Sequence, residues 1–219
     1  DADEADGLHF LVMEFVEGQD LARAVDRHGP LPVAKAIDYV LQAARGLDYA
    51  HGQGLVHRDI KPSNLVLDRS GTVKILDMGL ARFEQEIGPR SSAGAGTLTQ
   101  SEQMMGTIDY MPPEQAEDAH GVDQRADVYS LGCTLFYLLT GAPVYEGDSV
   151  LAKLLAHQQA EVPSLSKIRP EVPEALDRAF QKMVAKRAEE RQQSMGEVIA
   201  DLERCRKALL TEATETFSP

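Results

Sequence analysis

A short polar segment of the chain carries the residue types that phosphoryl transfer requires. Its sequence is His57-Arg58-Asp59-Ile60-Lys61-Pro62-Ser63-Asn64. The Asp59 carboxylate could orient an attacking hydroxyl and accept its proton, and the Lys61 ammonium could stabilise the transferring phosphoryl group. The Asn64 side chain could hold a metal ion near the phosphates. The alternative is a chance His-Arg-Asp tripeptide in a polar loop. Other motifs in the sequence are needed to choose between these two interpretations.

This segment fits the pattern His-Arg-Asp-Leu-x-x-x-Asn of the protein kinase catalytic loop, with Ile60 in place of Leu. Further along, Asp77-Met78-Gly79 resembles the Asp-Phe-Gly motif, whose Asp chelates the magnesium ion that bridges the phosphates. Met78 is apolar and adaptable, so it suits the hydrophobic slot of the usual Phe. An Asp-x-Gly turn without function is the alternative for this tripeptide.

Three later motifs extend the resemblance. Residues 106–114 (GTIDYMPPE) are similar to the end of a kinase activation segment, with Pro-Pro-Glu in place of Ala-Pro-Glu. Residues 127–132 (DVYSLG) resemble the start of the central helix of the C-lobe, and Arg191 resembles the arginine that pairs with the Glu of Ala-Pro-Glu. The order and spacing of five motifs exclude chance. The chain resembles a eukaryotic-type serine/threonine protein kinase of the bacterial kind, over about residues 8–209.

The resemblance assigns structural and catalytic roles. Lys61, two residues after Asp59, and Thr107, directly after Gly106, are typical of the serine/threonine branch. In that branch this Thr contacts the catalytic Asp and Lys. The resemblance also implies an ion pair between Glu114 and Arg191, although Arg187-Ala188 replaces the usual Asp-Pro before that arginine. The third structural residue it implies is Asp127, at the start of the central helix.

The resemblance further implies that the chain uses ATP and Mg²⁺. Residues 11–18 (LVMEFVEG) resemble the fifth strand and hinge of a kinase. The residues expected to contact ATP are Met13 as gatekeeper, Glu14 and Val16 through their backbones to adenine, Asp20 to the ribose, and Val66 as the adenine floor. Core packing is the alternative for the three apolar side chains, and a simple helix-start carboxylate is the alternative for Asp20.

Arg58 directly before Asp59 is typical of kinases whose activation loop is ordered by phosphorylation. Charge-assisted hydrogen bonds from arginine would stabilise the added phosphate. The candidate acceptors are Thr99 and Ser101, which precede Gly106 by seven and five residues. A hydrophilic loop that is never modified is the alternative.

Hydrophobic patterns predict the elements that position these residues. We expect a strand over 8–16, a short helix over 20–27, a long helix over 32–52, a hairpin with strands 65–67 and 73–76, and helices over about 125–140, 148–159, 173–186 and 195–209. The fold class is therefore α+β: a mainly helical protein kinase C-lobe with short β hairpins, preceded by the hinge strand. Residues 1–7 are expected to be a linker, 8–209 a partial kinase domain, and 210–219 a tail or linker.

The composition of the chain indicates which kinds of partner and which cellular location to expect. The 219 residues carry a formal net charge of -13, which disfavours nucleic acid and anionic membrane surfaces as partners. No apolar run is long enough for a transmembrane segment. Cys133 and Cys205 are expected to be buried thiols in a reducing compartment. We therefore expect a cytoplasmic location, or the intracellular part of a larger membrane-anchored kinase.

The expected function is transfer of the ATP γ-phosphate to Ser and Thr hydroxyls of protein substrates. Neither a G-x-G-x-x-G loop nor a V-A-I-K strand occurs in the 219 residues, so we expect a fragment without the N-lobe that is inactive in isolation. The alternative is a non-catalytic, pseudokinase-like scaffold. The intact set of Asp59, Lys61, Asn64 and Asp77 argues against it, because a scaffold need not keep a base and metal ligands.

Overall fold

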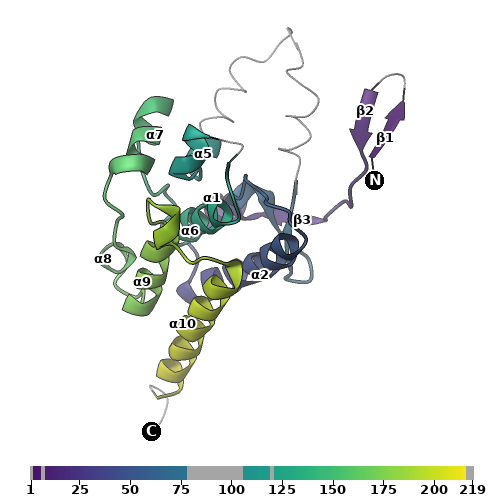
Figure 1. Cartoon of the computed structure of the whole chain (residues 1–219). Coiled ribbons are helices and arrows are strands. Elements are labelled where there is room, and N and C mark those ends of the chain that lie inside the picture. The colour runs from purple at the N-terminus through teal and green to yellow at the C-terminus, as the bar shows by residue number, and fades with distance from the viewer. Residues whose placement is uncertain (1, 6–7, 78–105, 119–120, 216–219) are drawn as a thin grey trace.

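The computed structural model describes all residues except 1, 6–7, 78–105, 119–120 and 216–219 (Figure 1). Its elements are β1 (Ala2–Ala5), β2 (Leu8–Leu11), β3 (Gly18–Asp20), α1 (Leu21–His28), α2 (Val33–Gly52), the 3-10 turn η1 (Pro62–Asn64), β4 (Leu65–Asp68), β5 (Val73–Ile75), α5 (Pro113–Glu117), α6 (Arg125–Thr140), α7 (Val150–Gln159), α8 (Leu165–Ile168), α9 (Glu174–Met183), the 3-10 turn η2 (Ala188–Glu190) and α10 (Met195–Glu215). The described strands all lie before residue 76, with α1 and α2 between β3 and β4, and the described elements after them are helical, which confirms the predicted α+β class.

Helix α6 forms the centre of the helical body. Its residues 126–136 are all buried, because α2, α9 and α10 pack around it. A helix enclosed on all sides is apolar around most of its circumference, and α6 carries that pattern. Close approach to the end of α9 depends on Gly132, since a Cβ there would lie 2.7 Å from Val184 Cγ1. The helix predicted over 125–140 is thus both present and the main support of the core.

Helix α10 lies along α2 and covers one side of that long helix (Figure 1). The stripe that faces the core is Met195, Val198, Leu202 and Cys205, flanked by the partly buried Ile199 and Leu209. Ser194 begins the helix by accepting a hydrogen bond from the Glu197 amide through its hydroxyl. The helix predicted to end near residue 209 continues to Glu215, so the segment 210–219, predicted to be a tail or linker, begins as helix. No Gly or Pro interrupts residues 209–215, so nothing local ends the helix earlier.

Two small antiparallel sheets precede the helical body. In the first sheet β1 pairs with β2, with Ala2 opposite Leu11, and Figure 1 shows this hairpin apart from the helices. The predicted linker over 1–7 therefore contains a strand. The strand predicted over 8–16 ends at Leu11, because β1 offers only four residues for pairing and residues 12–17 form no ladder.

The second sheet has the strand order β3-β4-β5 and contacts η1, which belongs to residues 57–64, the candidate catalytic segment. The predicted hairpin over 65–76 is confirmed, and Asp68 stabilises its turn by accepting hydrogen bonds from the Ser70 and Thr72 amides. Gly18 allows β3 to approach β4, because a Cβ at Gly18 would lie 2.3 Å from the Leu67 carbonyl oxygen.

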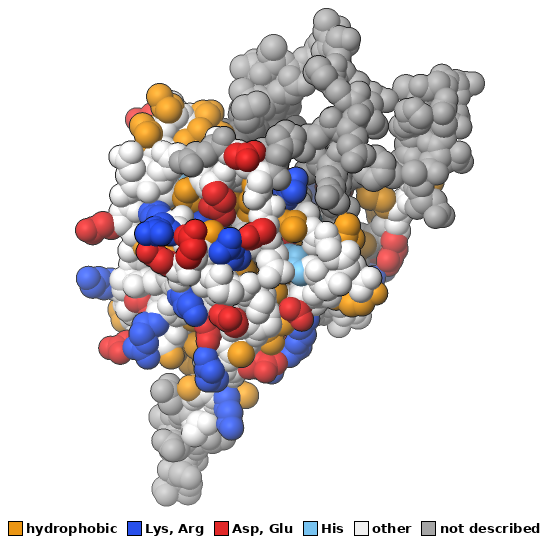
Figure 2. Space-filling model, in the orientation of Figure 1, with side chains coloured by type: hydrophobic (Ala, Val, Ile, Leu, Met, Phe, Trp, Pro, Cys, Tyr) orange, Lys and Arg blue, Asp and Glu red, His pale blue; other side chains and the backbone are white. Residues whose placement is uncertain are grey.

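The remaining expectations concern thiols and membranes. Cys133 and Cys205 are both free and buried, as predicted. Burial raises the pKa of the Cys133 thiol well above its usual range, so this side chain stays protonated. None of the helices that the structure describes combines the length and hydropathy needed to cross a membrane. On the face in Figure 2, Lys and Arg side chains lie among Asp and Glu side chains instead of forming one basic patch.

His157, at the end of α7, is buried, and its Nδ1 lies 2.7 Å from the Tyr129 hydroxyl. Burial, together with the nearby cations Lys186 and Lys153, lowers the pKa of the imidazole to about 4. Between pH ~6.5 and about 4, His157 is therefore protonated in the unfolded chain and neutral in the folded state.

We predict that acid weakens the fold through His157. The free energy of unfolding should fall by roughly 3 kcal/mol as the pH drops from about 6.5 to about 4, because only the unfolded state is protonated in that window. His157→Gln should flatten this slope in urea titrations at several pH values. The exposed His28→Gln should leave the slope as in the parent, and equal slopes in both variants would contradict the prediction.

Candidate active site

The catalytic segment is held by the carboxylate of Asp127, which is fully buried at the start of α6. The backbone amides of His57 and Arg58 donate to it over 2.9 and 2.8 Å. His51 Nε2, at the end of α2, donates to the same group over 2.8 Å. Three donors from two segments thus meet one carboxylate, and they hold Arg58 at a φ of 68°, a conformation that side chains rarely adopt.

A second link joins this segment to the strand that precedes Asp77. His57 Nδ1 accepts from the Asp59 amide over 3.2 Å, so its Nε2 carries the proton and donates to the Leu76 carbonyl over 2.8 Å. The Leu76 amide in turn donates to the Asn64 carbonyl over 2.8 Å. Asp77 follows directly, with a φ of 58°. Asp77 therefore lies close to residues 57–64 in space, although the two are separated in the sequence.

Four of the predicted residues form one hydrogen-bonded cluster. Lys61 Nζ lies 2.9 Å from Asp59 Oδ2 and donates to the Thr107 hydroxyl over 2.8 Å. Asn64 Nδ2 donates to both the carbonyl and the carboxylate of Asp59, over 2.8 and 3.1 Å. The Asp59 side chain is about one-third exposed, so a substrate hydroxyl can reach it. The cluster supplies a proton acceptor and a fixed cation side by side.

The donor chemistry of Asn64 and Asp77 fits a magnesium ion. Both hydrogens of the Asn64 amide are used toward Asp59, which leaves its amide oxygen as the atom able to face a cation. Asp77 adds an exposed carboxylate. Mg²⁺ prefers one or two such oxygen ligands together with phosphate oxygens and water. Within the described ranges, no group of three or more His, Cys, Asp or Glu is placed to hold a metal ion.

The segment after Thr107 is anchored to the late helices by the expected ion pair. Arg191 donates to both carboxylate oxygens of Glu114, over 2.6 and 2.7 Å. Its Nε donates to the Ala185 carbonyl over 2.8 Å, and its guanidinium lies 4.8 Å from the centre of the Tyr129 ring. Helix α9 ends at Met183, three residues before the predicted end. The replacement of Asp-Pro before Arg191 does not prevent the pairing.

Comparison with known families decides the class of protein. The sequence profile described as "Protein kinase domain" matches residues 2–199. The chain belongs to the protein kinase domain family. This confirms the resemblance inferred from the motifs.

Three bacterial proteins illustrate the similarity of this kinase domain to curated relatives. The chain is 36% identical over 202 residues to the "Probable serine/threonine-protein kinase PknB" of Lactococcus lactis, covering 92% of this chain and 31% of that protein. It is 35% identical over 211 residues to PknB of Mycolicibacterium smegmatis, covering 96% and 32%. For the serine/threonine-protein kinase PrkC of Bacillus subtilis, the identity is 33% over 202 residues, covering 92% and 30%. The chain thus spans about a third of the length of these relatives.

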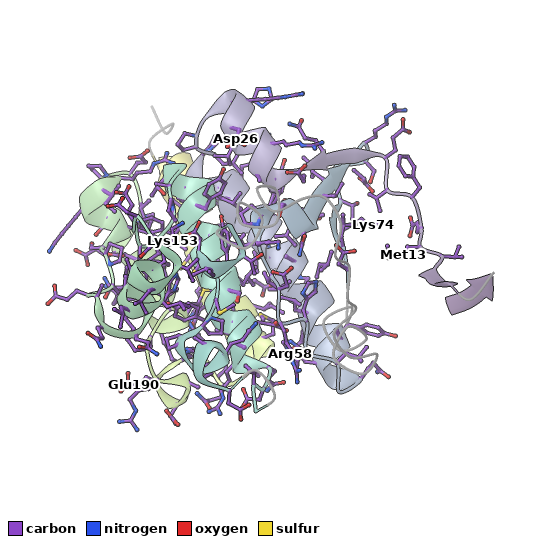
Figure 3. The ribbon with its side chains drawn as sticks, turned by 90° about the horizontal axis from the view of Figure 1, so that it is seen from above. Met13, Asp26, Arg58, Lys74, Lys153 and Glu190 are labelled. Atoms are coloured by element: carbon purple, nitrogen blue, oxygen red, sulfur yellow. The ribbon has the colours of Figure 1, made fainter. Side chains whose placement is uncertain are left out.

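The residues predicted to contact ATP are only partly brought together in the kinase domain. Asp20 and Val66 are opposite each other in the β3–β4 ladder, and Val66 is buried. Asp20 also caps α1, because its carboxylate accepts from the Arg23 amide over 2.9 Å. Met13 is 61% exposed on the outlying segment that leads to β2, away from the helices (Figure 3).

Two other hinge residues take different positions. Val16 is half-buried, and Glu14 pairs through its side chain with Lys74 on β5 at 2.9 Å, which leaves its backbone as the group toward adenine. The roles of all five ATP residues stay predictions.

Of the three residues expected to regulate activity, the structure describes only Arg58. Thr99 and Ser101 lie outside the described residues. Arg58 is described, and among the described residues no acidic side chain pairs with its guanidinium, while its carbonyl accepts from Gln115 Nε2 over 3.0 Å. Neither Gln115 nor His51 belongs to a sequence motif that carries chemistry, so neither could be predicted as part of the site. Their roles depend on contacts between distant segments.

We predict that Arg191→Ala lowers the free energy of unfolding by about 3–5 kcal/mol, because it leaves the Glu114 carboxylate and several carbonyls without their buried partner. Urea unfolding measures the change. The matched control is Arg178→Ala, whose ion pair with Glu174 has side chains 71% and 86% exposed, and it should cost less than about 0.5 kcal/mol. An unchanged midpoint for Arg191→Ala would show that the pair does not tie the segment down.

Proposed function

We propose that this chain forms the catalytic C-lobe of a serine/threonine protein kinase, which transfers the γ-phosphate of ATP to Ser and Thr hydroxyls of protein substrates. The observation that carries the proposal is the cluster of Asp59, Lys61, Asn64 and Thr107, in which base, cation and metal ligand are held by mutual hydrogen bonds. Similarity to bacterial serine/threonine kinases over nearly the whole chain supports it.

In this proposal the Asp59 carboxylate orients the substrate hydroxyl and accepts its proton. The Lys61 ammonium, 2.9 Å from Asp59, stands next to the reacting oxygen and stabilises the charge of the phosphoryl group during transfer. The Thr107 hydroxyl accepts from Lys61 and so fixes the direction of that side chain. The proton leaves the substrate oxygen for Asp59 as that oxygen bonds to the γ-phosphorus. The bond between the γ-phosphorus and the β–γ bridging oxygen breaks at the same time, and ADP leaves with that oxygen.

Asn64 and Asp77 would hold the magnesium ion through their side-chain oxygens. Bound Mg²⁺ neutralises phosphate charge and aligns the phosphates for in-line transfer. We assign Met13, Glu14, Val16, Asp20 and Val66 to adenosine binding, as the resemblance implies. The free buried thiols agree with our placement of the domain in a reducing, ATP-containing cytoplasm.

Radiolabelled phosphate transfer from Mg-ATP to a Ser-containing protein tests the assignment. The natural protein that contains this chain should be active, and Asp59→Asn should lower kcat by about 10²–10⁴-fold, because the proton acceptor is lost. Asp38→Asn, a matched change at a half-exposed carboxylate on α2, should leave kcat unchanged. The isolated 219 residues should show no turnover, since they contain no Gly-rich loop or strand lysine.

Two outcomes would count against the assignment. An inactive natural protein would favour the non-catalytic scaffold, and equal activity without Asp59 would remove Asp59 from the reaction. Turnover by the isolated chain would contradict only its expected inactivity.

We further propose that phosphorylation of Thr99 or Ser101 activates the kinase through Arg58, whose guanidinium would donate charge-assisted hydrogen bonds to the phosphate. Replacing both residues with Ala should lower activity about tenfold or more, since one such bond is worth at least ~1.5 kcal/mol. Mass spectrometry of the active protein should find phosphate at one of the two sites. The matched Ser91→Ala, Ser92→Ala variant should keep full activity, and an unmodified but active protein would refute this regulation.

A further inference from the structure

A short ion pair joins the segment after Thr107 to helix α7. Lys153 Nζ, on α7, lies 2.5 Å from Asp109 Oδ1. The two side chains are 12% and 14% exposed, so the pair is shielded from solvent unlike most ion pairs of this domain. Figure 3 shows Lys153 within the helical body, on the side away from Met13. Asp109 lies within the 106–114 motif but has no assigned role there, and Lys153 belongs to none of the motifs.

The segment that Asp109 belongs to begins at the catalytic cluster. The Thr107 hydroxyl accepts from Lys61, whose Nζ also touches Asp59. Asp109 follows Thr107 by two residues, which places its backbone within about 7 Å of chain length from that contact. A peptide that presents a hydroxyl to Asp59 therefore has its neighbouring residues within reach of residues 108–111.

The other residues of this segment are held by contacts with α6 and with Arg191. Ile108 is buried, and the Tyr110 carbonyl accepts from the Ser130 hydroxyl on α6 over 2.7 Å. The next residues are held by the Glu114–Arg191 pair. These contacts hold the segment against α6 and the late helices, whereas the Asp109–Lys153 pair ties it sideways to α7. Loss of Lys153 would remove the ion pair that holds this segment to α7.

The charge on Asp109 depends on its partner. Burial raises the pKa of the Asp109 carboxyl, while Lys153 acts in the opposite direction by hydrogen bonding and charge. With Lys153 present, the pair is neutral as a whole. Without it, an uncompensated carboxylate stands beside the peptide path.

We propose that Lys153 is a positioning residue for the protein substrate: by pairing with Asp109 it fixes the shape and the neutral charge of the segment against which the substrate peptide lies. This inference rests on the proposed kinase function. It assigns to the pair an effect on peptide affinity and on charge selectivity, and none on the transfer step itself.

The experiment uses the natural protein and two Ser peptides that differ only in the residue after the acceptor, Ala or Arg. Lys153→Met should raise the KM for the Ala peptide about fivefold, with kcat and the KM for ATP unchanged, as expected for lost substrate binding. It should also create a preference for the Arg peptide, because Asp109 is then unpaired. Lys182→Met, which removes an exposed lysine on α9, serves as the control and should change neither.

Two further variants separate positioning from a general loss of structure. The charge-reversed pair Asp109→Lys, Lys153→Asp should recover most of the affinity for the Ala peptide. Asp109→Asn, which removes the charge, should show no preference for the Arg peptide. A KM that is unchanged in Lys153→Met, or a fall in kcat with no change in peptide selectivity, would overturn the inference. If Lys153→Met does not fold, Lys153→Gln takes its place in the same measurements.

Failure of the kinase assignment would be seen separately. A natural protein without transfer activity would refute the proposed function, and the same peptides would then be titrated into it by fluorescence anisotropy with Mg-ATP present. Weaker binding of the Ala peptide to Lys153→Met, restored by charge reversal, would support the positioning role even then. Equal binding by all variants would refute it.

Discussion

The buried carboxylate of Asp127 is the interaction on which the arrangement of this domain depends. It accepts hydrogen bonds from the amides of His57 and Arg58 and from the His51 imidazole. A charge without solvent is stable only when such donors surround it, so the catalytic segment must curl around the start of α6. This geometry directs Asp59 and Lys61 outward while it forces Arg58 into a left-handed backbone conformation.

Helix α6 therefore positions the loops of the candidate site in addition to forming part of the core. Its N-terminal end fixes the catalytic segment through Asp127, and its Ser130 holds the carbonyl of Tyr110. Arg191 binds Glu114 and also donates to the Arg125 carbonyl at the beginning of the same helix. Loops that are far apart in the sequence thus contact one buried helix. These contacts fix the positions of the loops relative to one another.

Two kinds of charge pairing serve different purposes here. The Glu114–Arg191 pair is held from several sides, by carbonyls and by the Tyr129 ring, and it fixes where the chain runs. The Asp109–Lys153 pair rests on one direct contact between a loop and α7. The first is suited to stability, and the second to adjusting the surface that a substrate meets. Exposed pairs such as Arg178–Glu174 contribute little to either.

The sequence by itself determined the family, the helical body and the composition of the catalytic cluster. Helix periodicity located the buried stripe of α10, because packing against one core repeats every turn. Motif residues such as Asp59 and Asn64 could be assigned because they lie on one short loop, where sequence spacing nearly equals spatial spacing. The pairing of Glu114 with Arg191 could be expected only through the resemblance, since no local rule joins residues so far apart.

Tertiary structure decided the rest. It paired β1 with β2 and ended the predicted strand at Leu11, because the length of a strand depends on the partner available. It also revealed His51 beneath the catalytic segment and Lys153 beside Asp109. Neither side chain has a distinctive local sequence. Their importance arises from burial and from a charged neighbour, and both are properties of the folded chain alone.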